Sequence, residues 1–581
     1  MAINLTYPML YMEFIVYYAA MSSTKSLVKP MKETPSKNDV SASSDSDKAF
    51  SGAELLVQTL EENGVEYIFG VPGDIENEFF GVLKDSTITF FNTRIEQTGA
   101  MMADVYYRLT GKIGVCFSTL GPGATNMITG VANAHQDRSA ILALSGQLAA
   151  EKHFEDSHQY IDLIKMYSPV TKESIMIDRA RDIDADINKA IKMALQEKPG
   201  PVHVTVPINV LKEDARHYRT IDRHDEVSYN YADDLEKLYN KIAESDSIIA
   251  IVGNGVVRAR AVEELKKFLE EYEIPAFASF MGKGVLPENH RLSLGVLSRH
   301  SQKARDVLGK HQVVITIGYD PIEGVEPDIW KGAGFVAHID SSIPSARSIY
   351  KPDLEIIGDN KDILNDLVTK FSPVKKNHAS LADMKIVSET PESVEHDFPI
   401  DPRYITKTLR RLLAGSDIVV SDVGYHKQYV GLHYPTYQPN TTVFSNGLSS
   451  MGFGLPGAMA AKLVLPNKKV VVICGDGGFQ MNIQELATIV ENQLNIVVII
   501  MNDNSLGMVK KKQLEVVGHH YAADFMSSPN FSEIAKSYGC EGHKISSAEE
   551  LESVLSDALQ SERCTVIDVP IKQYTDIKAM K

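Results

Sequence analysis

From Ser51 onward, short runs of apolar residues alternate with stretches whose apolar residues recur at helical spacing. This alternation is typical of strands and helices arranged in parallel α/β layers. Two polar stretches, around residues 212–232 and 373–398, divide the pattern into three blocks, so we expect three doubly wound parallel-sheet domains. The predicted strands are Tyr67–Val71, Thr87–Phe91, Ile113–Ser118, Ala140–Ser145 and Val202–Val206 in the first block, Ser247–Val252, Pro275–Ser279, Val313–Ile317 and Val336–Ile339 in the second, and Ile418–Ser421, Val443–Ser445, Lys469–Cys474, Asn495–Met501 and Cys564–Val569 in the third.

The first fifty residues lack this pattern. Their apolar segment, Tyr7–Met21, is interrupted by Glu13, is too short to cross a membrane and lacks the basic start of a secretory signal. An organelle transit peptide is rich in arginine, whereas the first arginine here is Arg94. Residues 22–49 carry almost no large apolar side chains and are predicted to be disordered. We therefore expect residues 1–50 to be a dispensable extension, with a targeting signal as the alternative.

Composition and charge exclude several classes of function. The chain has 581 residues, 44% hydrophobic and 23% charged, which is ordinary for a globular protein. Its 59 Lys and Arg against 76 Asp and Glu give a net charge of −17, which argues against a broad face for nucleic acid or an anionic membrane. The four cysteines are far apart in sequence and indicate reduced, buried thiols of a cytoplasmic protein. They are Cys116, Cys474, Cys540 and Cys564.

Acidic residues and glycines follow two predicted strands of the third block. Gly475-Asp476-Gly477-Gly478 precedes a helix predicted near Asn482–Glu491, and Asn502-Asp503-Asn504-Ser505 follows the next strand. Glycines let main-chain N–H groups approach a diphosphate, and a helix N-terminus favours an anion. Asp476 and Asp503, on adjacent strand ends, offer oxygen ligands to Mg²⁺. The pair predicts a metal and diphosphate site; two ordinary turns are the alternative.

These motifs resemble the thiamin-diphosphate signature of the pyruvate-oxidase and acetolactate-synthase superfamily. The resemblance covers nearly everything after Ser51 and implies a pyrimidine-binding domain at 51–215, a central Rossmann-like domain at 232–372 and a diphosphate-binding domain at 399–575. It also implies a homodimer or homotetramer with active sites at the interface between chains. The other motifs that carry it are Phe69-Gly70-Val71-Pro72-Gly73, Arg94-Ile95-Glu96-Gln97, Gly121-Pro122-Gly123-Ala124-Thr125-Asn126, and Asn446-Gly447 with Met451-Gly452-Phe453-Gly454-Leu455-Pro456.

The resemblance assigns roles to individual residues. Glu96 matches the glutamate that exchanges a proton with the aminopyrimidine ring of the cofactor; a surface glutamate at a helix start is the alternative. Met451 matches the large apolar residue that holds the cofactor bent. Asp476, Asp503 and the Ser505 carbonyl are the implied Mg²⁺ ligands, although the family often has asparagine in place of Asp503. Further implied cofactor contacts are Pro72, Asn126, His426, Asn446, Gly447, Gly475, Gly477, Gly478 and Met508, and Gln159 of the His158-Gln159 pair is implied to face the substrate.

The central block is similar to that of the catabolic, FAD-independent acetolactate synthases. Gly253-Asn254-Gly255 lacks the third glycine of a dinucleotide fingerprint, so close strand-to-helix packing is the preferred interpretation and FAD is not expected. FAD-dependent anabolic synthases place a tryptophan shortly after the element matched by Gly507-Met508-Val509, whereas Lys510-Lys511-Lys512 follows it here. That departure favours a reaction between two pyruvates but leaves the acceptor substrate in doubt. The segments that carry this similarity are Gly318-Tyr319-Asp320-Pro321-Ile322-Glu323, His338-Ile339-Asp340 and Pro352-Asp353-Leu354-Glu355.

The resemblance thus predicts an acetolactate synthase, which decarboxylates pyruvate on thiamin diphosphate and couples the hydroxyethyl unit to a second pyruvate, giving 2-acetolactate and CO₂. Another thiamin-diphosphate-dependent 2-oxo acid decarboxylase or carboligase is the first alternative. Asp74 is reminiscent of such decarboxylases, although a turn after Pro72-Gly73 explains it equally well. A catalytically silent regulatory subunit is the second alternative, and the intact Glu96, Asp476 and Asp503 argue against it.

Overall fold

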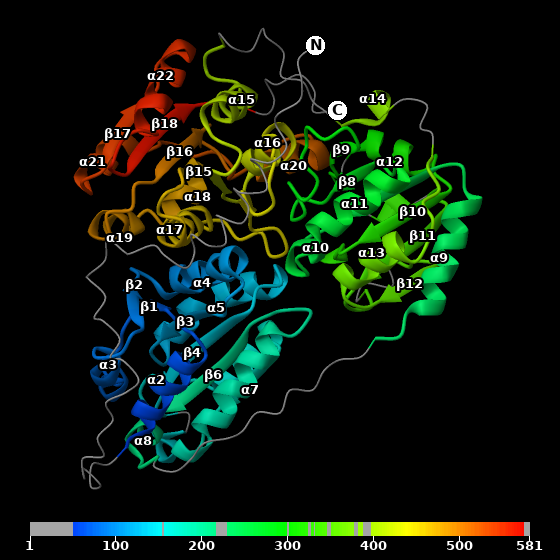
Figure 1. The fold of residues 1–581 in the computed structure, drawn as a ribbon. Coiled ribbons are helices and arrows are strands. Elements are labelled where there is room, and N and C mark those ends of the chain that lie inside the picture. Colours follow the sequence, from blue (N-terminus) through cyan, green and yellow to red (C-terminus); the bar gives the residue numbers. More distant parts are fainter. Residues whose placement is uncertain are drawn as a thin grey trace, which may run out of the picture. The chain divides into compact units, whose positions relative to one another are not determined.

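A computed structural model gives the fold of the chain (Figure 1). It describes residues 50–153, 156–215, 229–298, 301–323, 327–330, 332–344, 350–376, 381–386 and 397–573. The predicted extension, apart from Phe50, lies outside the described residues.

The first block forms a six-stranded sheet, drawn blue to cyan in Figure 1, in the order β2-β1-β3-β4-β6-β5. All of its strand pairs are parallel. Its strands are β1 (Tyr67–Gly70), β2 (Thr89–Asn92), β3 (Gly114–Ser118), β4 (Ile141–Gln147), β5 (Glu173–Met176) and β6 (Val202–Pro207). Its helices are α2 (Gly52–Glu62), α3 (Asn77–Leu83), α4 (Glu96–Thr110), α5 (Pro122–Gln136), α6 (Leu163–Tyr167), α7 (Ile183–Leu195) and α8 (Ile208–Lys212).

The second block, drawn green, forms a parallel sheet in the order β12-β11-β10-β7-β8-β9. Its strands are β7 (Ile248–Val252), β8 (Ala276–Ala278), β9 (Ser293–Val296), β10 (Val313–Ile317), β11 (Phe335–Asp340) and β12 (Leu354–Ile357). Its helices are α9 (Ala232–Glu244), α10 (Gly255–Arg258), α11 (Val262–Tyr272), α12 (Gln302–Leu308), α13 (Asn360–Thr369) and α14 (Leu381–Met384).

The third block, drawn yellow to red, forms a parallel sheet in the order β14-β13-β15-β16-β18-β17. Its strands are β13 (Ile418–Ser421), β14 (Thr442–Phe444), β15 (Val470–Gly475), β16 (Val497–Asn502), β17 (Glu541–Lys544) and β18 (Thr565–Pro570). Its helices are α15 (Pro402–Leu412), α16 (Tyr425–His433), α17 (Gly454–Val464), α18 (Asp476–Met481), α19 (Glu485–Glu491), α20 (Gly507–Val517), α21 (Phe531–Ser537) and α22 (Ala548–Ala558). The prediction of three doubly wound parallel sheets is confirmed.

The strands that the sequence pattern did not predict all lie at sheet edges. They are β5, β9, β12 and β17. An edge strand has a neighbour on one side only, so it can carry polar residues and need not form a continuous apolar run. In β17 the sequence Glu541-Gly542-His543-Lys544 is half-buried at its start and exposed at its end. Apolar periodicity therefore detects the interior of each sheet better than its border.

The first and third sheets share one hydrophobic core, in which α4 of the first block packs against α17 of the third. Both helices contribute small buried residues to this core, which include Ala100 and Ala103 of α4 and Ala458 and Ala461 of α17. The central sheet has two separate cores of its own. The shared core fixes α4, whose first residue is Glu96, against the helix that follows Met451.

All four cysteines are free thiols and buried, as expected. Although they are far apart in sequence, Cys540 comes directly before β17 and Cys564 directly before the neighbouring strand β18, and the Cys564 thiol lowers the pKa of Cys540. In the described part of the chain, no helix combines the length and the apolar character that crossing a membrane requires.

Candidate active site

The third sheet places Asp476 at the carboxyl end of a buried strand. β15 ends at Gly475 in extended backbone, and α18 begins directly at Asp476. The prediction of one helix near Asn482–Glu491 missed α18 and begins three residues too early for α19, because Asn482 itself leaves the helical region (φ −131°, ψ 24°) and separates the two helices. The Asp476 side chain is buried. One of its oxygens accepts the Gly477 N–H at 3.0 Å, while Oδ2 has no hydrogen-bond partner among the described residues.

Asp503 stands at the end of the adjacent strand. β15 and β16 are paired so that Gly475 is opposite Met501, which brings the residues that follow the two strands to the same edge. The Asp503 Oδ1 atom accepts the Ser505 N–H at 3.1 Å. Burial, together with the charge of Asp503, raises the pKa of Asp476 to about 7. Burial also raises the pKa of Asp503.

This arrangement fits a divalent cation. The buried carboxylate of Asp476 and the half-buried carboxylate of Asp503, on neighbouring strand ends, disfavour each other's ionised form, and a hard cation between them would remove that penalty. The Ser505 side chain, beside the implied carbonyl ligand, is buried and its hydroxyl has no hydrogen-bond partner in the described structure. Within that structure, no cluster of three or more His, Cys, Asp and Glu side chains could hold a metal, so a cation here needs main-chain or ligand oxygens as well.

Two residues that follow β13 shape the glycine loop. A Cβ atom added to Gly478 would lie 2.4 Å from Asp422 Oδ2, and one added to Gly475 would lie 3.2 Å from His426 Nδ1. Burial lowers the pKa of His426 to about 4, so its ring is neutral, and its Nε2 atom has no hydrogen-bond partner in the part described. Only glycine therefore leaves room for Asp422 and His426 beside the loop that was predicted to hold the diphosphate, and the unused His426 Nε2 atom lies next to that loop.

Asp422 was not predicted as a site residue. Its carboxylate accepts main-chain N–H groups from Val423 at 2.7 Å, Phe453 at 3.1 Å and Gly452 at 3.2 Å. Burial raises its pKa to about 7. Asp422 thus ties the segment that contains Met451 to the glycine loop. A sequence signal existed, since an aspartate directly after a buried strand is the pattern that identified Asp476.

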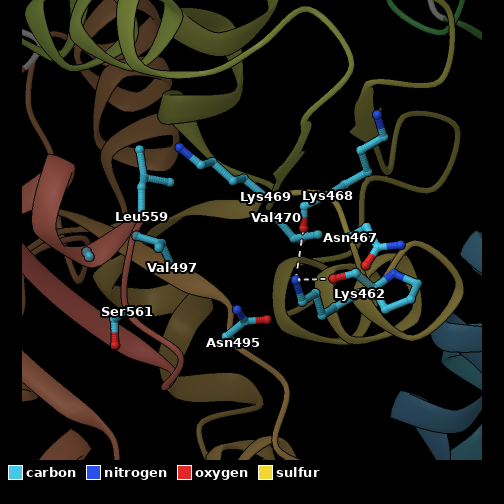
Figure 2. A pocket seen from close by; sticks show the side chains of 11 residues that line it. Lys462, Asn467, Lys468, Lys469, Val470, Asn495, Val497, Leu559 and Ser561 are labelled. Carbon is cyan, nitrogen blue, oxygen red and sulfur yellow. Dashed lines mark hydrogen bonds between the residues drawn. The ribbon is translucent and has the colours of Figure 1, made fainter. Parts of the chain in front are cut away.

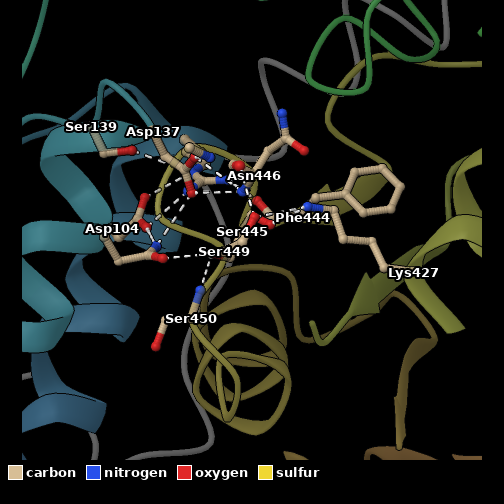
Figure 3. A network of polar contacts seen from close by, with 12 residues as sticks. Asp104, Asp137, Ser139, Lys427, Phe444, Ser445, Asn446, Ser449 and Ser450 are labelled. Atoms are coloured by element: carbon tan, nitrogen blue, oxygen red, sulfur yellow. Dashed lines mark hydrogen bonds and ion pairs between the residues drawn. The ribbon is translucent and has the colours of Figure 1, made fainter. Parts of the chain in front are cut away.

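A buried ionic network holds Asn446 and Gly447 against the first domain (Figure 3). The Asp137 carboxylate accepts the Asn446 N–H at 3.1 Å and the Gly447 N–H at 2.6 Å. Arg108 lies between two carboxylates, donating to Asp104 at 2.7 Å and to Asp137 at 2.8 Å. The Asn446 side-chain nitrogen has no hydrogen-bond partner among the described residues, so it is available to a ligand.

Met451 lies between this network and α17. It is half-buried, and the next residue, Gly452, has a left-handed backbone (φ +85°) that favours glycine. Asn482 donates to the Gly452 carbonyl at 2.6 Å and holds the turn in place. The backbone around Met451 is therefore fixed by contacts on both sides.

In the first domain, Glu96 is the first residue of α4 and only 7% exposed, so it is not a surface glutamate. Its Oε2 atom accepts a hydrogen bond from the Asn126 amide at 3.1 Å. A Cβ atom on Gly123 would lie 3.1 Å from Glu96 Oε1. The structure thus brings together the Glu96 motif and the Gly121–Asn126 motif.

The remaining predicted site residues are exposed. Gln159 is exposed and sits against Gly121, where an added Cβ would lie 2.7 Å from the Gln159 carbonyl oxygen. Pro72 is exposed, and Met508 on α20 is 36% exposed. Asp74 is exposed too, and its carbonyl accepts the Asn77 amide at 2.7 Å, which fits a turn residue before α3.

Within one chain the site residues belong to two different sheets, with their helices and loops. No hydrogen bond or ion pair of the described residues joins Glu96 to Asp476 or Asp503. Glu96, Asn126 and Gln159 belong to the first sheet, whereas the aspartates, His426 and Met451 belong to the third.

Comparison with known proteins agrees with the order of these groups. Three family models match: the N-terminal TPP binding domain of thiamine pyrophosphate enzymes at residues 50–166, their central domain at 235–367 and their C-terminal TPP binding domain at 422–569. The chain is 33% identical over 549 residues to a probable acetolactate synthase large subunit of Methanococcus aeolicus, covering 90% of this chain and 92% of that protein. It is 32% identical to the acetolactate synthase isozyme 3 large subunit of Escherichia coli (90% and 95%) and 31% identical to the acetolactate synthase of Bacillus subtilis (90% and 94%).

This chain belongs to the acetolactate synthase family. The family resemblance drawn from the motifs is thereby confirmed, together with thiamin diphosphate as the cofactor of its domains. The roles of individual site residues stay predictions.

In this acetolactate synthase family member, the glycines of the central domain serve close packing. A Cβ atom added to Gly253 would lie 2.3 Å from the Gly318 carbonyl oxygen, so the two loops after β7 and β10 touch through their backbones. This contact joins two loops, whereas close packing of a strand against a helix was predicted. Ion pairs to the first domain lie at the same sheet edge: Arg138 to Asp320 at 2.9 Å, and Lys198 to Asp340 at 3.2 Å.

The lysine run that departs from the family pattern lies on α20. Lys510 bonds to Asp524 at 2.8 Å and to Gln573 at 2.9 Å. Lys511 lies over the ring of Tyr425, 5.0 Å from its centroid. Lys512 is exposed. The first two lysines therefore tie α20 to the surroundings of Asp503 and His426.

A cavity of about 150 Å³ lies at the amino ends of β15 and β16, on the side of the third sheet away from the aspartates (Figure 2). It is lined by Val470 and Val497, which begin β15 and β16, whereas the aspartates follow the ends of these strands. The Lys462 ammonium group beside it donates to the carbonyls of Pro466 at 2.8 Å and Lys468 at 2.9 Å. This cavity is not part of the candidate active site.

Proposed function

We propose that this protein is an acetolactate synthase, which decarboxylates pyruvate and couples the remaining two-carbon unit to a second pyruvate, giving 2-acetolactate and CO₂. The observation that carries the proposal is the pair of Asp476, which is buried, and Asp503, which is half-buried, on adjoining strand ends, in a chain whose relatives over nine-tenths of its length are acetolactate synthases. When bound, thiamin diphosphate supplies the electron sink that lets a 2-oxo acid lose CO₂.

The third domain would hold the diphosphate and its metal. Asp476, Asp503 and the Ser505 carbonyl bind Mg²⁺ in this proposal, which is supported by the unused carboxyl oxygen of Asp476. Gly475, Gly477 and Gly478 leave the α18 N-terminus open to an anion. His426 and Asn446 offer their unpaired nitrogen atoms, Gly447 its main chain, and Met451 and Met508 their apolar side chains.

The first domain would hold the aminopyrimidine ring. Glu96 exchanges a proton with the ring there, and Asn126 orients the Glu96 carboxyl group through its 3.1 Å hydrogen bond. Pro72 lies beside the ring, and Gln159 faces the substrate.

A complete site would require two copies of the chain. Glu96 belongs to the first sheet and Asp476 and Asp503 to the third, an arrangement that accords with a homodimer, or a homotetramer built from it, in which the first domain of one copy meets the third domain of its partner. The domain boundaries at 51–215, 232–372 and 399–575 and a cytoplasmic location are parts of the same proposal.

Product analysis with pyruvate as the only substrate tests this function. The full chain with added thiamin diphosphate and Mg²⁺ should form 2-acetolactate, which NMR of the reaction mixture identifies directly. Acetaldehyde as the only product would indicate a non-coupling decarboxylase instead. Absence of both products would contradict an activity on pyruvate.

Catalysis is expected to need no flavin. Carbon–carbon bond formation from two pyruvates involves no net electron transfer, and ion pairs and glycine contacts occupy the edge of the central sheet where a dinucleotide would bind. Protein purified under mild conditions should be colourless and active without added FAD. An absorption spectrum paired with activity before and after FAD addition is the measurement. Stoichiometric flavin whose removal stops turnover would overturn this prediction.

A further inference from the structure

Glu76 is a buried carboxyl group outside the predicted site residues. It stands at the N-cap position of α3, where a side chain usually bonds the first turn of the helix, yet it forms no such bond. Its side chain instead turns inward and is only 1% exposed. A glutamate at this position is therefore not explained by helix capping.

Thr119, Gly146 and Gly73 closely surround the Glu76 carboxyl group. Thr119 Oγ1 lies 3.0 Å from Glu76 Oε1, and the two are hydrogen-bonded. A Cβ atom on Gly146 would lie 1.8 Å from Oε1, and one on Gly73 would lie 2.4 Å from Oε2. The Oε2 atom is buried without a hydrogen-bond partner in the described part of the chain. Such an atom destabilises the fold and calls for an explanation in function.

The Glu76 carboxyl group lies at the carboxyl ends of the strands of the first sheet, where sheets of this kind bind ligands. Gly73 follows β1, Thr119 follows β3 and Gly146 lies near the end of β4, which are three neighbouring strands. The strand order reverses between β1 and β3, and ligands of doubly wound sheets bind at the carboxyl ends of strands at that point.

Thr119 connects Glu76 to the candidate active site. It is half-buried, whereas Glu76 is buried. A Cβ atom on Gly123 would lie 2.9 Å from the Thr119 methyl group and 3.1 Å from Glu96 Oε1. The Thr119 methyl group thus faces the Gly123–Glu96 contact, whereas its hydroxyl faces Glu76 and Gly73, where an added Cβ would lie 2.4 Å from Thr119 Oγ1, next to Pro72.

Among the described residues, the Glu76 carboxyl group has no ion-pair partner. Burial, with a smaller contribution from the charge of Asp74, raises its pKa to about 7, although the Thr119 hydrogen bond acts in the opposite direction. On α3, Glu78 is paired with Lys212 of α8 at 3.2 Å. Near neutral pH, Glu76 is present in both its neutral and its ionised form.

We propose that Glu76 and Thr119 form a proton relay at the candidate active site, in which Glu76 is a positioning residue that sets the direction of the Thr119 hydroxyl. When Glu76 is ionised, Thr119 donates its proton to Oε1. When Glu76 is neutral, its own O–H donates to Thr119, and the Thr119 proton points toward the site. The inference deepens the proposed function, because it concerns the fate of the two-carbon unit left after loss of CO₂.

The relay supplies a proton that competes with coupling. In proton transfer, the Thr119 O–H bond breaks and a C–H bond forms on the two-carbon unit, while the Glu76 proton moves to Thr119 and solvent later restores it. For the unit to leave as an aldehyde, its hydroxyl group would lose a proton to solvent, and the bond that joins it to the cofactor would break, with the electron pair returning to the cofactor. In coupling, a C–C bond to the second 2-oxo acid forms instead. The aldehyde share of the product should therefore rise as the pH falls.

The first experiment measures products from pyruvate between pH 6 and pH 8, using the full chain with thiamin diphosphate and Mg²⁺. In the wild type, the ratio of acetaldehyde to acetolactate should rise about tenfold from pH 8 to pH 6, as expected for a group that titrates near 7. Glu76→Gln and Thr119→Val should both give a ratio that does not change with pH, whereas Thr119→Ser, which keeps the hydroxyl, should retain the dependence. A Glu76→Gln ratio with the wild-type pH dependence would overturn the proposal.

The second experiment needs neither cofactor nor turnover. Because the folded pKa of Glu76 is raised above its unfolded value, its stabilising contribution is full at low pH and is lost as the pH rises through 7. Melting temperatures of cofactor-free protein should therefore favour Glu76→Gln over the wild type more at pH 8.5 than at pH 5.5. An equal difference at both pH values would overturn the relay even if acetolactate is made. If the protein makes neither product, the shift in melting temperature still supports titration of Glu76, and the failure belongs to the proposed function.

Discussion

Replacing Asp476 by alanine should abolish Mg²⁺-dependent retention of thiamin diphosphate. The loss in affinity should exceed about 100-fold. Even the loss of a residue that only hydrogen-bonds to a metal ligand weakens metal binding about 10- to 100-fold, and Asp476 is proposed as a ligand itself. The physical reason is that a single half-buried carboxylate, Asp503, with a main-chain carbonyl cannot hold the ion and the diphosphate together. Isothermal titration of the full chain with thiamin diphosphate in Mg²⁺ buffer measures the affinity directly.

Asp503→Asn is the matched control for this prediction. Asparagine keeps one oxygen ligand at the second strand end and removes one of the two like charges that raise the pKa of Asp476. Its affinity for the cofactor should stay within about tenfold of the wild type. Near-normal affinity in Asp476→Ala would remove this aspartate from the metal site.

Glu96→Gln should keep the fold while slowing cofactor activation by about 100- to 10,000-fold, the usual contribution of a positioned acid–base group. The glutamine side-chain oxygen can still accept the 3.1 Å hydrogen bond from Asn126, so the contact survives. An amide cannot exchange the proton, however. Exchange of the C2 proton of the bound cofactor, followed by NMR in deuterated buffer, is the measurement.

Two controls separate a chemical effect of Glu96→Gln from a structural one. The melting temperature and the affinity for thiamin diphosphate should both match the wild type, because the packing of the α4 N-terminus is unchanged. An unchanged exchange rate in the variant would refute the acid–base role of Glu96, whatever the effect on product formation.

The sequence pattern predicted the interior strands and the pairing of Asp476 with Asp503 for the same physical reason. Strands covered by helices on both faces are continuous apolar runs, and adjacent parallel strands end at one edge, so residues that follow them meet. Edge strands such as β17 are not detected in this way, because they include exposed polar residues and form no continuous apolar run.

The contacts that position the site were harder to predict. Asp137 holds the main chain of Asn446 and Gly447, which are more than 300 residues away, and nothing local to Asp137 indicates that partner. Glu76 is a similar case, because its sequence position suggests an ordinary helix cap. Only the strand order reveals that Gly73, Thr119 and Gly146 surround it. Pairings across the fold depend on tertiary structure that short-range patterns do not encode.

The core that α4 shares with α17 has a consequence for biosynthesis. A ribosome completes α4 long before it makes α17, and the whole central domain is synthesised between them, which takes on the order of half a minute at usual rates. During that interval the apolar face of α4 lacks its native partner and is open to chaperones or to other nascent chains. The central domain, with two cores of its own, can fold in the meantime. The amino-terminal domain is thus the first to be translated, yet it can finish folding only after the carboxyl-terminal domain has emerged.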